Sequence, residues 1–296
     1  MQIIFLGTSS MVPTKERNHS SILITYNSEN VLVDCGEGTQ RQLKIAGVKI
    51  AKITRILISH WHGDHVLGLP GLLQSLSSSD YNKILHIYGP KGTKKRIEMM
   101  FEVFGFDRKF EIKIEEIVSG RFFESDEFVL EAEQLEHNIE TLGYRLEEKG
   151  KIKINLSYTK KLGIPNGSLL GKLQEGKSIT WKGKKVDVEK ATMLAKGKSV
   201  AIVTDTIPCS GAYKLAKDVD ILISEATYAS DLEEKGMEHG HMTAKQAADI
   251  ANRGNAKQLI LTHFSARYKN TSELEDEART YFDNVLTAED FMKINL

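Results

Sequence analysis

The stretch RILISHWHGDHVLGLPG, residues 55–71, decides how this sequence is to be interpreted. Its β-branched apolar run at 56–58 is too short for a buried helix and is typical of a buried strand. Three histidines and one aspartate follow within six positions, namely His60, His62, Asp64 and His65. We expect them to lie in a loop at the C-terminal end of that strand, where Gly63 permits a tight turn.

This histidine-rich hexapeptide predicts a metal site. Imidazole and carboxylate groups are the ligands that borderline divalent metals such as zinc favour. His60 and His62 can face one position, and Asp64 and His65 a second position beside it. The alternative is a polar surface cluster without function, but a chain with 9 histidines in 296 residues predicts fewer than one in such a stretch.

The composition is that of a globular chain able to bury a sizeable core. Its 296 residues suit one large α/β domain or two small ones. Cys35 and Cys209 have no CxxC spacing, so neither a disulfide scaffold nor a cysteine-based zinc site is expected. The N-terminus lacks the basic and apolar segments of a signal peptide, and no run approaches the ~18 apolar residues of a membrane span. We therefore expect a cytoplasmic protein without membrane contact.

Short apolar runs repeatedly end in a residue that can bind metal or transfer protons. VLV is followed by Asp34, the two ILIS runs by His60 and Glu225, AIVT by Asp205 and LILT by His263. Strands rich in Val, Ile and Leu are typically buried on both faces beneath helices. Active sites of layered α/β folds gather at the carboxyl ends of strands. The sequence therefore predicts one shared site at one edge of the sheets.

Helices are predicted between these runs. Residues 92–104 carry apolar side chains at helical spacing. Gly254 is placed to end a helix that begins near residue 243. Capping boxes are predicted for two pairs, Thr243 with Gln246 and Ser272 with Glu275.

A net charge of zero conceals an uneven distribution. Residues 149–190 contain eleven lysines and three acidic residues, a net charge of +8 that leaves −8 on the rest of the chain. The segment is rich in glycine, and Pro-Asn-Gly at 165–167 predicts a turn. We expect an arm at about 150–190 that projects from a single domain spanning residues 1–296 and binds a polyanion. The alternative is an ordinary solvated loop.

Longer motifs resemble those of the ribonuclease Z family. HWHGDH is similar to the HxHxDH signature of the metallo-β-lactamase superfamily, and the other matches run nearly from end to end. They are LGTSSMVPTKERN (6–18), VDCGEGTQRQL (33–43), EHNIETLGYR (136–145), KLGIPNGSLLGKLQEG (161–176), VTDT (203–206), SEATY (224–228), GHMTA (240–244) and LTHFSARY (261–268). The resemblance implies an α/β fold of the metallo-β-lactamase type, an αββα four-layer sandwich with a projecting flexible arm.

The resemblance also implies two zinc ions and their ligands. His60, His62 and His137 would hold the first ion, Asp64, His65 and His263 the second, and Asp205 would bridge both. Asp34 would orient a ligand, as metal sites usually require, although an aspartate before Gly36 also suits a turn. His86 is expected to be a structural strand residue, and His19 and His239 are assigned no role.

The implied activity is endonucleolytic removal of the 3′ trailer from precursor tRNA, which leaves a 3′-hydroxyl on the tRNA and a 5′-phosphate on the trailer. Asp64 is the expected general base, and Glu225 and His241 the expected pair that protonates the leaving oxygen. The expected phosphate contacts of the arm are Lys160, Lys161, Lys172 and Lys177. Members of the family act as homodimers, so precursor tRNA and a second subunit are the expected partners, and DNA is not.

Two departures from the family pattern have consequences. The arm tip reads GIPNGSLLGKL, so Asn166 and Ser168 stand where the family has prolines, and a less rigid tip is expected. GHMTA has Met242 in place of serine, so a local hydrogen bond is expected to be absent.

Two other functions remain open at this point. One is a hydrolase of the same fold that acts on small phosphodiesters or thioesters, which would not need the lysine-rich arm or PTKERN. The other is an RNA-binding protein without catalytic activity, which would not need the complete set of ligand-type residues. Comparing activity towards a simple phosphodiester with activity towards precursor tRNA distinguishes the first alternative from a tRNA-processing enzyme. Metal content distinguishes the second.

Overall fold

A computed structural model describes residues 1–79, 81–105 and 108–296 and divides them into two compact units. The large unit consists of Met1–Phe123, Leu130–Leu146 and Ser199–Leu296. The small unit consists of Glu124–Val129 and Glu147–Lys198. The prediction of a single domain that carries an inserted arm stays a prediction.

The first sheet of the large unit is mixed, with strand order β18-β1-β2-β3-β4-β5-β6. The strands are β1 Gln2–Gly7, β2 Ser21–Tyr26, β3 Glu29–Val33, β4 Arg55–Leu57, β5 Leu85–Gly89, β6 Ile112–Glu116 and β18 Lys293–Asn295. Strands β3 to β6 run parallel, while β18, β1, β2 and β3 pair antiparallel. The helices beside this sheet are α1 Thr39–Ile45, α2 Gly63–Val66, α3 Leu69–Ser78 and α4 Thr93–Phe104, with a 3₁₀ turn at Ile50–Lys52. Leu43, Leu73 and Ile97 anchor these helices in one apolar core with the sheet.

The second sheet has the order β17-β16-β15-β14-β9-β8-β7. Its strands are β7 Gly120–Glu124, β8 Phe128–Leu135, β9 Thr141–Glu148, β14 Ser199–Val203, β15 Ile221–Glu225, β16 Leu259–Thr262 and β17 Val285–Thr287. Strands β14 to β17 run parallel. The helices on this side are α8 Ser210–Ala216, α9 Glu233–His239, α10 Ala244–Arg253 and α11 Ser272–Arg279, with a 3₁₀ turn at Ser230–Leu232. Leu215, Ile250 and Leu274 bury their side chains in the core they share with the sheet.

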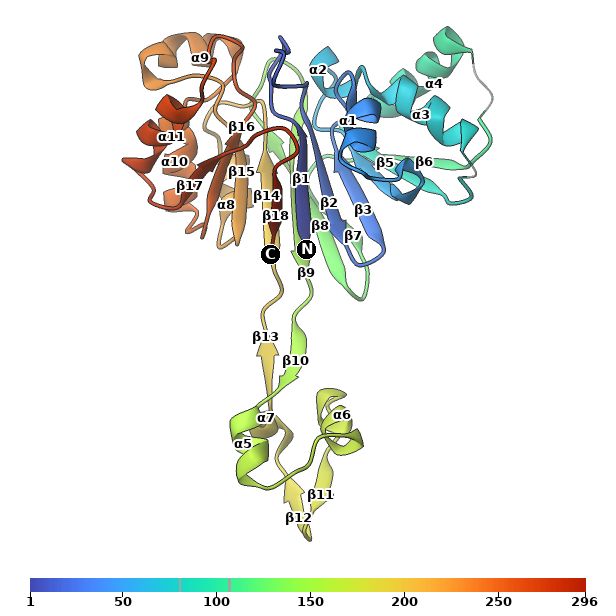
Figure 1. Ribbon diagram of the computed structural model, residues 1–296, viewed down its shortest axis with the longest axis vertical. Helices are drawn as coiled ribbons and strands as arrows, with labels where there is room; N and C mark the ends of the chain where they lie inside the picture. Colours follow the sequence, from blue (N-terminus) through green and yellow to red (C-terminus); the bar gives the residue numbers. More distant parts are fainter. Residues whose placement is uncertain (80, 106–107) are drawn as a thin grey trace. The chain divides into compact units, whose positions relative to one another are not determined.

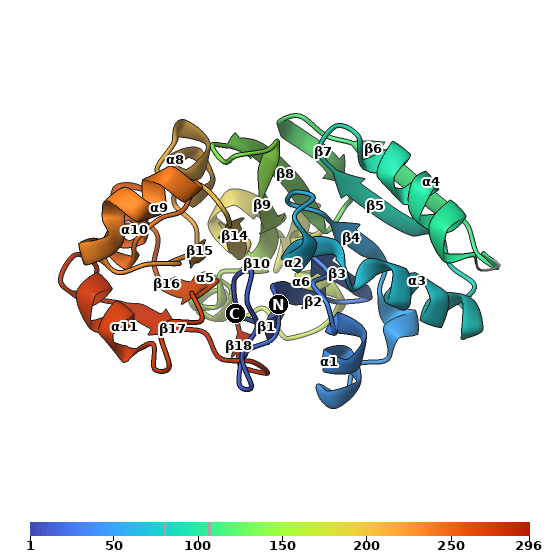
Figure 2. The same ribbon diagram turned by 90° about the horizontal axis from the view of Figure 1, so that it is seen from above.

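The two sheets of the large unit lie between the two groups of helices (Figures 1 and 2). This is the αββα sandwich that was predicted. Buried apolar runs form the parallel strands because both faces of each strand are covered, one by helices and one by the other sheet. No helix in the described residues is long and apolar enough to cross a membrane.

Most local predictions for the helices are confirmed. The predicted helix at 92–104 is α4, and Thr243 and Gln246 form the capping box of α10, which ends at Gly254. The second capping box is wrong. Thr271 is the N-cap of α11 and makes no side-chain capping bond. Glu275 instead accepts hydrogen bonds from Thr287 and from the side chain of Arg279, because its carboxylate is directed towards β17 and its own last turn.

The histidine-rich hexapeptide is only partly a loop. Residues 60–62 are irregular, but helix α2 begins at Gly63 and includes Asp64 and His65. Gly63 is absent from the positive-φ glycines, so it does not serve the tight turn that was expected. A side chain there would instead press on Leu67, since an added Cβ would lie 3.0 Å from the Leu67 Cδ1.

The small unit has its own small core. Strands β10 Lys151–Ile154 and β13 Thr192–Ala195 form an antiparallel ribbon, and β11 Ile179–Trp181 and β12 Lys184–Val186 form a hairpin. Its helices are α5 Leu156–Lys161, α6 Ser168–Gln174 and α7 Val188–Ala191. They bury Ile164, Leu173, Ile179, Val186 and Ala191 together. Residues 162–167 join α5 to α6, and the chain bends at residues 166–167, within the predicted turn.

The position of Met242 in the structure accounts for its presence where the family has serine. Its side chain is completely buried in the apolar core around α10, so packing takes the place of the hydrogen bond that serine would make. We expect Met242→Ser to lower the free energy of unfolding by about 2–5 kcal/mol, since it leaves a cavity and buries a hydroxyl. Met242→Leu conserves the volume and should cost less than about 1.5 kcal/mol. Urea titration of both variants measures this, and equal stability of the two would contradict the packing role.

Candidate metal centre and active site

Parallel strands bring the predicted strand-end residues to one edge of the large unit. Asp34 follows β3, Asp205 follows β14, and His263 follows β16 directly. These three residues have left-handed backbones, with φ of 59°, 44° and 61° respectively. Such conformations are uncommon outside glycine, although Asp and His tolerate them better than most residues, and they concentrate at functional sites. They turn each chain sharply as it leaves the sheet.

A first cluster combines His60, His62, His137 and Asp205, whose ligand atoms all lie within 4.8 Å of one another. The Nδ1 of His62 lies 3.0 Å from the Nε2 of His60 and 3.2 Å from the Nε2 of His137. The Oδ2 of Asp205 lies 3.6 Å from the His60 Nε2 and 3.9 Å from the His137 Nε2. Three ring nitrogens and one carboxylate oxygen thus converge on one point.

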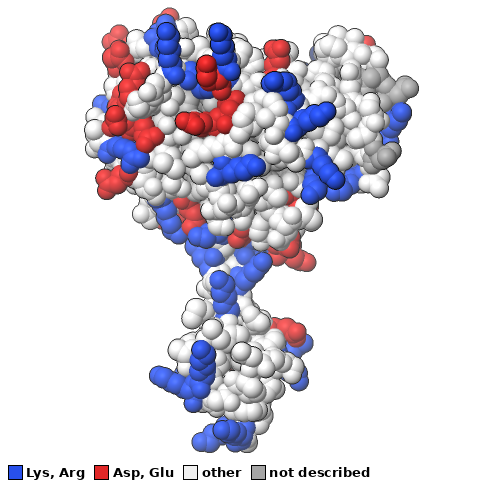
Figure 3. Space-filling model, viewed as in Figure 1, with Lys and Arg blue, Asp and Glu red and all other residues white. Residues whose placement is uncertain are grey.

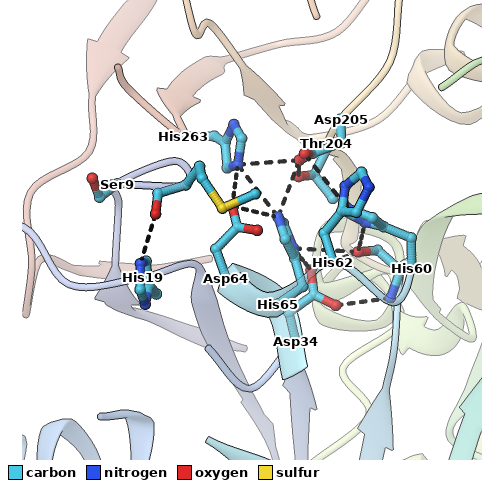
Figure 4. A network of polar contacts seen from close by, with 12 residues as sticks. Ser9, His19, Asp34, His60, His62, Asp64, His65, Thr204, Asp205 and His263 are labelled. Carbon is cyan, nitrogen blue, oxygen red and sulfur yellow. Dashed lines mark hydrogen bonds and ion pairs between the residues drawn. The ribbon is translucent and has the colours of Figure 1, made fainter. Parts of the chain in front are cut away.

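A second cluster combines Asp64, His65, Asp205 and His263 within the same distance limit. The Nε2 atoms of His65 and His263 are 3.3 Å apart, and each lies within 3.5 Å of the Oδ2 of Asp64. The Oδ1 of Asp205 is 3.3 Å from His65 Nε2 and 3.2 Å from His263 Nε2. Figure 4 shows these side chains directed towards one another.

Asp205 joins the two clusters through different oxygens. Its Oδ2 faces the first cluster and its Oδ1 the second. Burial opposes its ionisation, but the neighbouring His263, His65 and His60 hold the pKa of this carboxyl well below its usual range. A carboxylate that presents one oxygen to each of two histidine clusters is the arrangement expected of a ligand shared by two cations.

Two imidazoles are oriented by Asp34 and Ser59. The Oδ2 of Asp34 lies 2.7 Å from the Nδ1 of His65, so this nitrogen carries the proton and the Nε2 lone pair faces the second cluster. Ser59 donates its hydroxyl to the same Asp34 oxygen at 2.8 Å. The Ser59 oxygen therefore accepts a hydrogen bond from the Nδ1 of His60, 3.0 Å away, and the His60 Nε2 lone pair faces the first cluster.

Two further imidazoles are oriented in the same sense from the second sheet. The Nδ1 of His137 donates to the backbone carbonyl of Gly240 at 2.8 Å. Thr227 donates its hydroxyl to Glu225 at 2.7 Å, so its oxygen accepts from the Nδ1 of His263 at 3.0 Å. Sequence reasoning missed Ser59 and Thr227. Both belong to quoted motifs, but a hydroxyl residue next to a strand end gives no local signal of which ring it will contact.

The residues present fit divalent cations. Four imidazoles point Nε2 lone pairs inward, and mutually facing lone pairs repel unless a cation or proton lies between them. The Oδ1 of Asp64 is buried and makes no hydrogen bond within the described residues, which suits an oxygen that contacts a cation or the water beside one. Burial lowers the pKa of His60 and favours its neutral, metal-binding form. Burial has the same effect on His65, but the carboxylates of Asp205 and Asp34 outweigh it and raise the pKa of that ring, so a cation in the second cluster would displace a proton from it.

A third group lies beside the two clusters. Glu225 is completely buried at the end of β15, and its Oε1 accepts a hydrogen bond from the Thr206 backbone N–H at 2.7 Å. The same oxygen lies 3.2 Å from the Nδ1 of His241, whose ring is partly exposed. Burial opposes a charge on this ring, but the Glu225 carboxylate outweighs it and raises the pKa of His241 to about 9. The contact with Glu225 thus favours the protonated form of His241 beside the clusters.

These groups open onto a cavity of about 400 Å³. Its lining includes Met11, Tyr228 and Lys235 as well as His241. His239 also lines it, although no role was predicted for it from the sequence. His19 lies outside, where its Nε2 contacts the Met11 carbonyl at 3.1 Å and so fixes the loop on the cavity's edge.

The remaining residues singled out from the sequence are four lysines and the structural residue His86. Lys160, Lys161, Lys172 and Lys177 are exposed in the small unit, where Lys177 pairs with Glu175 at 2.6 Å. Figure 3 shows Lys and Arg side chains outnumbering acidic ones on that unit. His86 is a strand residue in β5, stacked at 6.2 Å on Tyr88, in keeping with the structural role expected.

Comparisons with known proteins agree along the whole chain. Residues 185–264 match the beta-lactamase superfamily domain, and residues 1–118 match the family of the anti-Pycsar protein Apyc1. Ribonuclease Z of Archaeoglobus fulgidus is 38% identical over 100% of this chain and 97% of its own length. Ribonuclease Z of Crocosphaera subtropica is 40% identical over 99% of this chain and 97% of its own.

Solved structures give the same picture. The short form of human tRNase Z superimposes with a TM-score of 0.74 and 30% identity, covering 100% of this chain and 99% of its own. A metallo-beta-lactamase fold protein of Bacillus subtilis, YhfI, has a TM-score of 0.71 at 20% identity over 99% of this chain and 98% of its own, which shows the shared fold alone.

Proposed function

This chain belongs to the ribonuclease Z family and is a tRNA 3′-processing endonuclease, and we propose that the two linked clusters around Asp205 are its catalytic site. The observation that carries the proposal is Asp205, whose two carboxylate oxygens face two separate sets of imidazoles. Incubation with end-labelled precursor tRNA and mapping of the cut tests it. A single cut at the 3′ end of the tRNA, with a 5′-phosphate on the trailer, is expected.

We infer that the site holds two zinc ions. His60, His62 and His137 would hold one ion, Asp64, His65 and His263 the other, and Asp205 both. Imidazole and carboxylate donors are the set that zinc accepts. When bound, such a pair of ions supplies Lewis-acid stabilisation of charge on phosphoryl oxygens and lowers the pKa of water. Metal analysis of the purified protein is expected to give two ions per chain.

Asp64 is the residue we assign as general base. Its Oδ1 is buried, has no hydrogen-bond donor among the described residues and belongs to a side chain that lines the cavity. It can therefore accept the proton that water loses as its oxygen bonds to phosphorus. The bond that breaks is the one between phosphorus and the ribose 3′-oxygen of the tRNA.

The leaving 3′-oxygen needs a proton, and His241 is placed to give it. Its Nδ1 is engaged by Glu225 at 3.2 Å, which leaves Nε2–H for a substrate atom. Glu225 is fixed by Thr206 and Thr227, so the ring is held in a donating orientation. Transfer of the Nε2 proton gives the 3′-hydroxyl of the product tRNA.

We expect His241→Ala to slow precursor cleavage by about 10²–10⁴-fold while both metals stay bound. A phosphodiester with a nitrophenolate leaving group needs no proton at that oxygen, so it should be hydrolysed nearly normally. His239→Ala is the matched control, because His239 lines the same cavity but belongs to none of the ligand clusters found among the described residues. Equal losses on both substrates would show that His241 only supports the structure of the site.

The lysines of the small unit are assigned to tRNA binding. Lys160, Lys161, Lys172 and Lys177 are exposed on α5, on α6 and in the turn after α6. Lysines contact phosphates without reading sequence. Such contacts suit an enzyme that must accept many tRNAs by their shared shape.

We further infer a homodimer in which the small unit of one subunit presents tRNA to the site of its partner. A mixing experiment tests this directly. A subunit without the small unit's helices should cleave precursor tRNA poorly, and a subunit with Asp205→Asn should not cleave it. Mixed dimers should recover activity, because one intact site then meets one intact arm. Dimers that form without recovery would show that each subunit uses its own arm.

A further inference from the structure

A second and larger cavity adjoins the candidate active site. Its volume is about 910 Å³, in the range of ligand-binding cavities. His137 and Asn138 line both cavities, so the two cavities meet at these residues. All of its lining residues belong to the large unit. None of the chemistry described above uses this space.

The lining of the second cavity includes more exposed apolar side chains than an ordinary solvent-facing surface. Val118, Ile139 and Met237 are large apolar residues with 64%, 37% and 53% of their surface exposed, and all three line it. Apolar side chains gathered at one exposed place typically mark a binding site. Lys91 is a cation that can contact a phosphate. Glu136 and Glu140 are carboxylates that can accept hydrogen bonds from amino groups of bases but repel phosphates, so the part of the lining beside Lys91 suits the RNA backbone. The lining therefore suits nucleobases with a phosphate at Lys91.

Hydrogen bonds connect one wall of this cavity, the segment Pro90–Lys91, to the segment His60–His62 that carries two candidate metal ligands. The indole N–H of Trp61, between His60 and His62, donates to the Thr93 hydroxyl at 2.9 Å. Thr93 in turn donates to the Pro90 carbonyl at 2.7 Å. The backbone N–H groups of Gly92 and Lys94 both donate to Glu116 at 3.0 Å. The Pro90–Lys91 segment is thus held in place before any ligand arrives, which lowers the ordering cost of binding.

We propose that this cavity holds the first nucleotides of the 3′ trailer, beyond His137 from the scissile phosphate. The inference rests on the proposed function. The acceptor stem is a base-paired helix and too wide to enter, whereas an unpaired trailer can place its bases singly against apolar side chains. Continuity with the active site through His137 and Asn138 places the cavity where the chain must continue after the cut.

The test compares precursors that differ only in trailer length. The intact enzyme should cleave a precursor with a trailer of about six nucleotides at a higher kcat/KM than one with a single-nucleotide trailer. Val118→Asp and Met237→Asp each replace an apolar side chain on which a base would pack by a charged one, and should lower kcat/KM for the long trailer about tenfold through KM. The same variants should change the single-nucleotide precursor far less.

The matched control is Val103→Asp on α4, which adds the same charge at a side chain that is 73% exposed and outside the cavity. It should keep the full preference for long trailers. Equal loss on both precursors in the cavity variants would place the tRNA end there and overturn the proposal. Unchanged preference would also overturn it and leave the cavity to another ligand.

A binding readout separates this inference from the proposed function. A precursor with a non-hydrolysable scissile linkage and a photoreactive second trailer base is bound to the holoenzyme and irradiated. Crosslinks to peptides containing Val118, Ile139 or Met237 are expected. Crosslinks only elsewhere would refute the trailer cavity even if cleavage is normal, whereas a chain that cleaves no precursor would refute the function while the crosslink still reports the cavity.

Discussion

Asp205→Ala is expected to abolish precursor cleavage and to remove metal from both clusters. Among the described residues, Asp205 alone is shared by the two clusters, with Oδ2 towards His60 and His137 and Oδ1 towards His65 and His263. Losing both oxygens removes a ligand from each cluster and leaves buried imidazoles facing one another. Metal ions supply several kcal/mol of transition-state stabilisation, so the loss in rate should be about 10³-fold or more.

A second substitution separates this effect from damage to the fold. Asp205 has φ of 44°, where alanine is strained but asparagine is tolerated. Asp205→Asn should therefore fold normally, yet lose metal and activity, because it has lost the negative charge and one of the two oxygens. Asp249→Ala is the matched control, because it also removes one aspartate but lies on the exposed face of α10. This variant should keep its metal and its activity. Two tightly bound ions and normal turnover in Asp205→Asn would refute the shared-ligand assignment.

Removal of the outer part of the small unit should cause the second large effect. Ile154 and Thr192 are paired at the end of the β10–β13 ribbon, so a short Gly-Ser turn can replace residues 155–191 without disturbing either strand. The deletion removes all five buried residues of the small core, and of the residues packed against them only Ile154 remains. None of the candidate metal ligands lies within it.

We expect this deletion to keep both metals and the hydrolysis of a small phosphodiester, and to raise KM for precursor tRNA by about 10²-fold or more. Its lysines should also set part of the salt dependence, since each phosphate contact contributes about 0.7–0.9 to the slope of log K against log salt. Affinity for precursor tRNA is measured at several salt concentrations for the deletion and the intact chain.

The matched control for the deletion replaces Lys160, Lys161, Lys172 and Lys177 by glutamine and keeps the small core. It should weaken affinity and lower the salt slope in proportion to the number of lysines that bind phosphate. Unchanged affinity and slope in both proteins would make the small unit an ordinary solvated element, and tRNA would then have to be bound by the large unit alone.

The sequence alone determined where the buried strands lie and which polar residues follow them. Runs such as ILIS and LILT form buried parallel strands because their side chains are apolar on both faces. A residue that follows such a strand must lie at the same edge as its counterparts, so His60, Asp205, Glu225 and His263 could be brought together from sequence. Capping of α10 by Thr243 was equally local, since both partners lie within one turn of helix.

Local patterns failed where a partner comes from elsewhere in the chain. Glu275 matches a capping box, but Thr287 of β17 binds its carboxylate instead. Met242 was expected to lose a hydrogen bond, and tertiary packing shows that its side chain is part of the core. His137 follows a charged stretch and has no strand signal of its own, so only the family resemblance indicated it.

Only the tertiary structure decided what each site atom faces. Which nitrogen of an imidazole points inward depends on Asp34, Ser59, Thr227 and the Gly240 carbonyl, which come from distant segments of both sheets. Which Asp205 oxygen faces which cluster likewise depends on the tertiary structure, because the ligands of each cluster come from both sheets. The physical reason is that spacing along a chain sets which residues arrive at an edge, whereas hydrogen-bond geometry between separate strands sets their orientation.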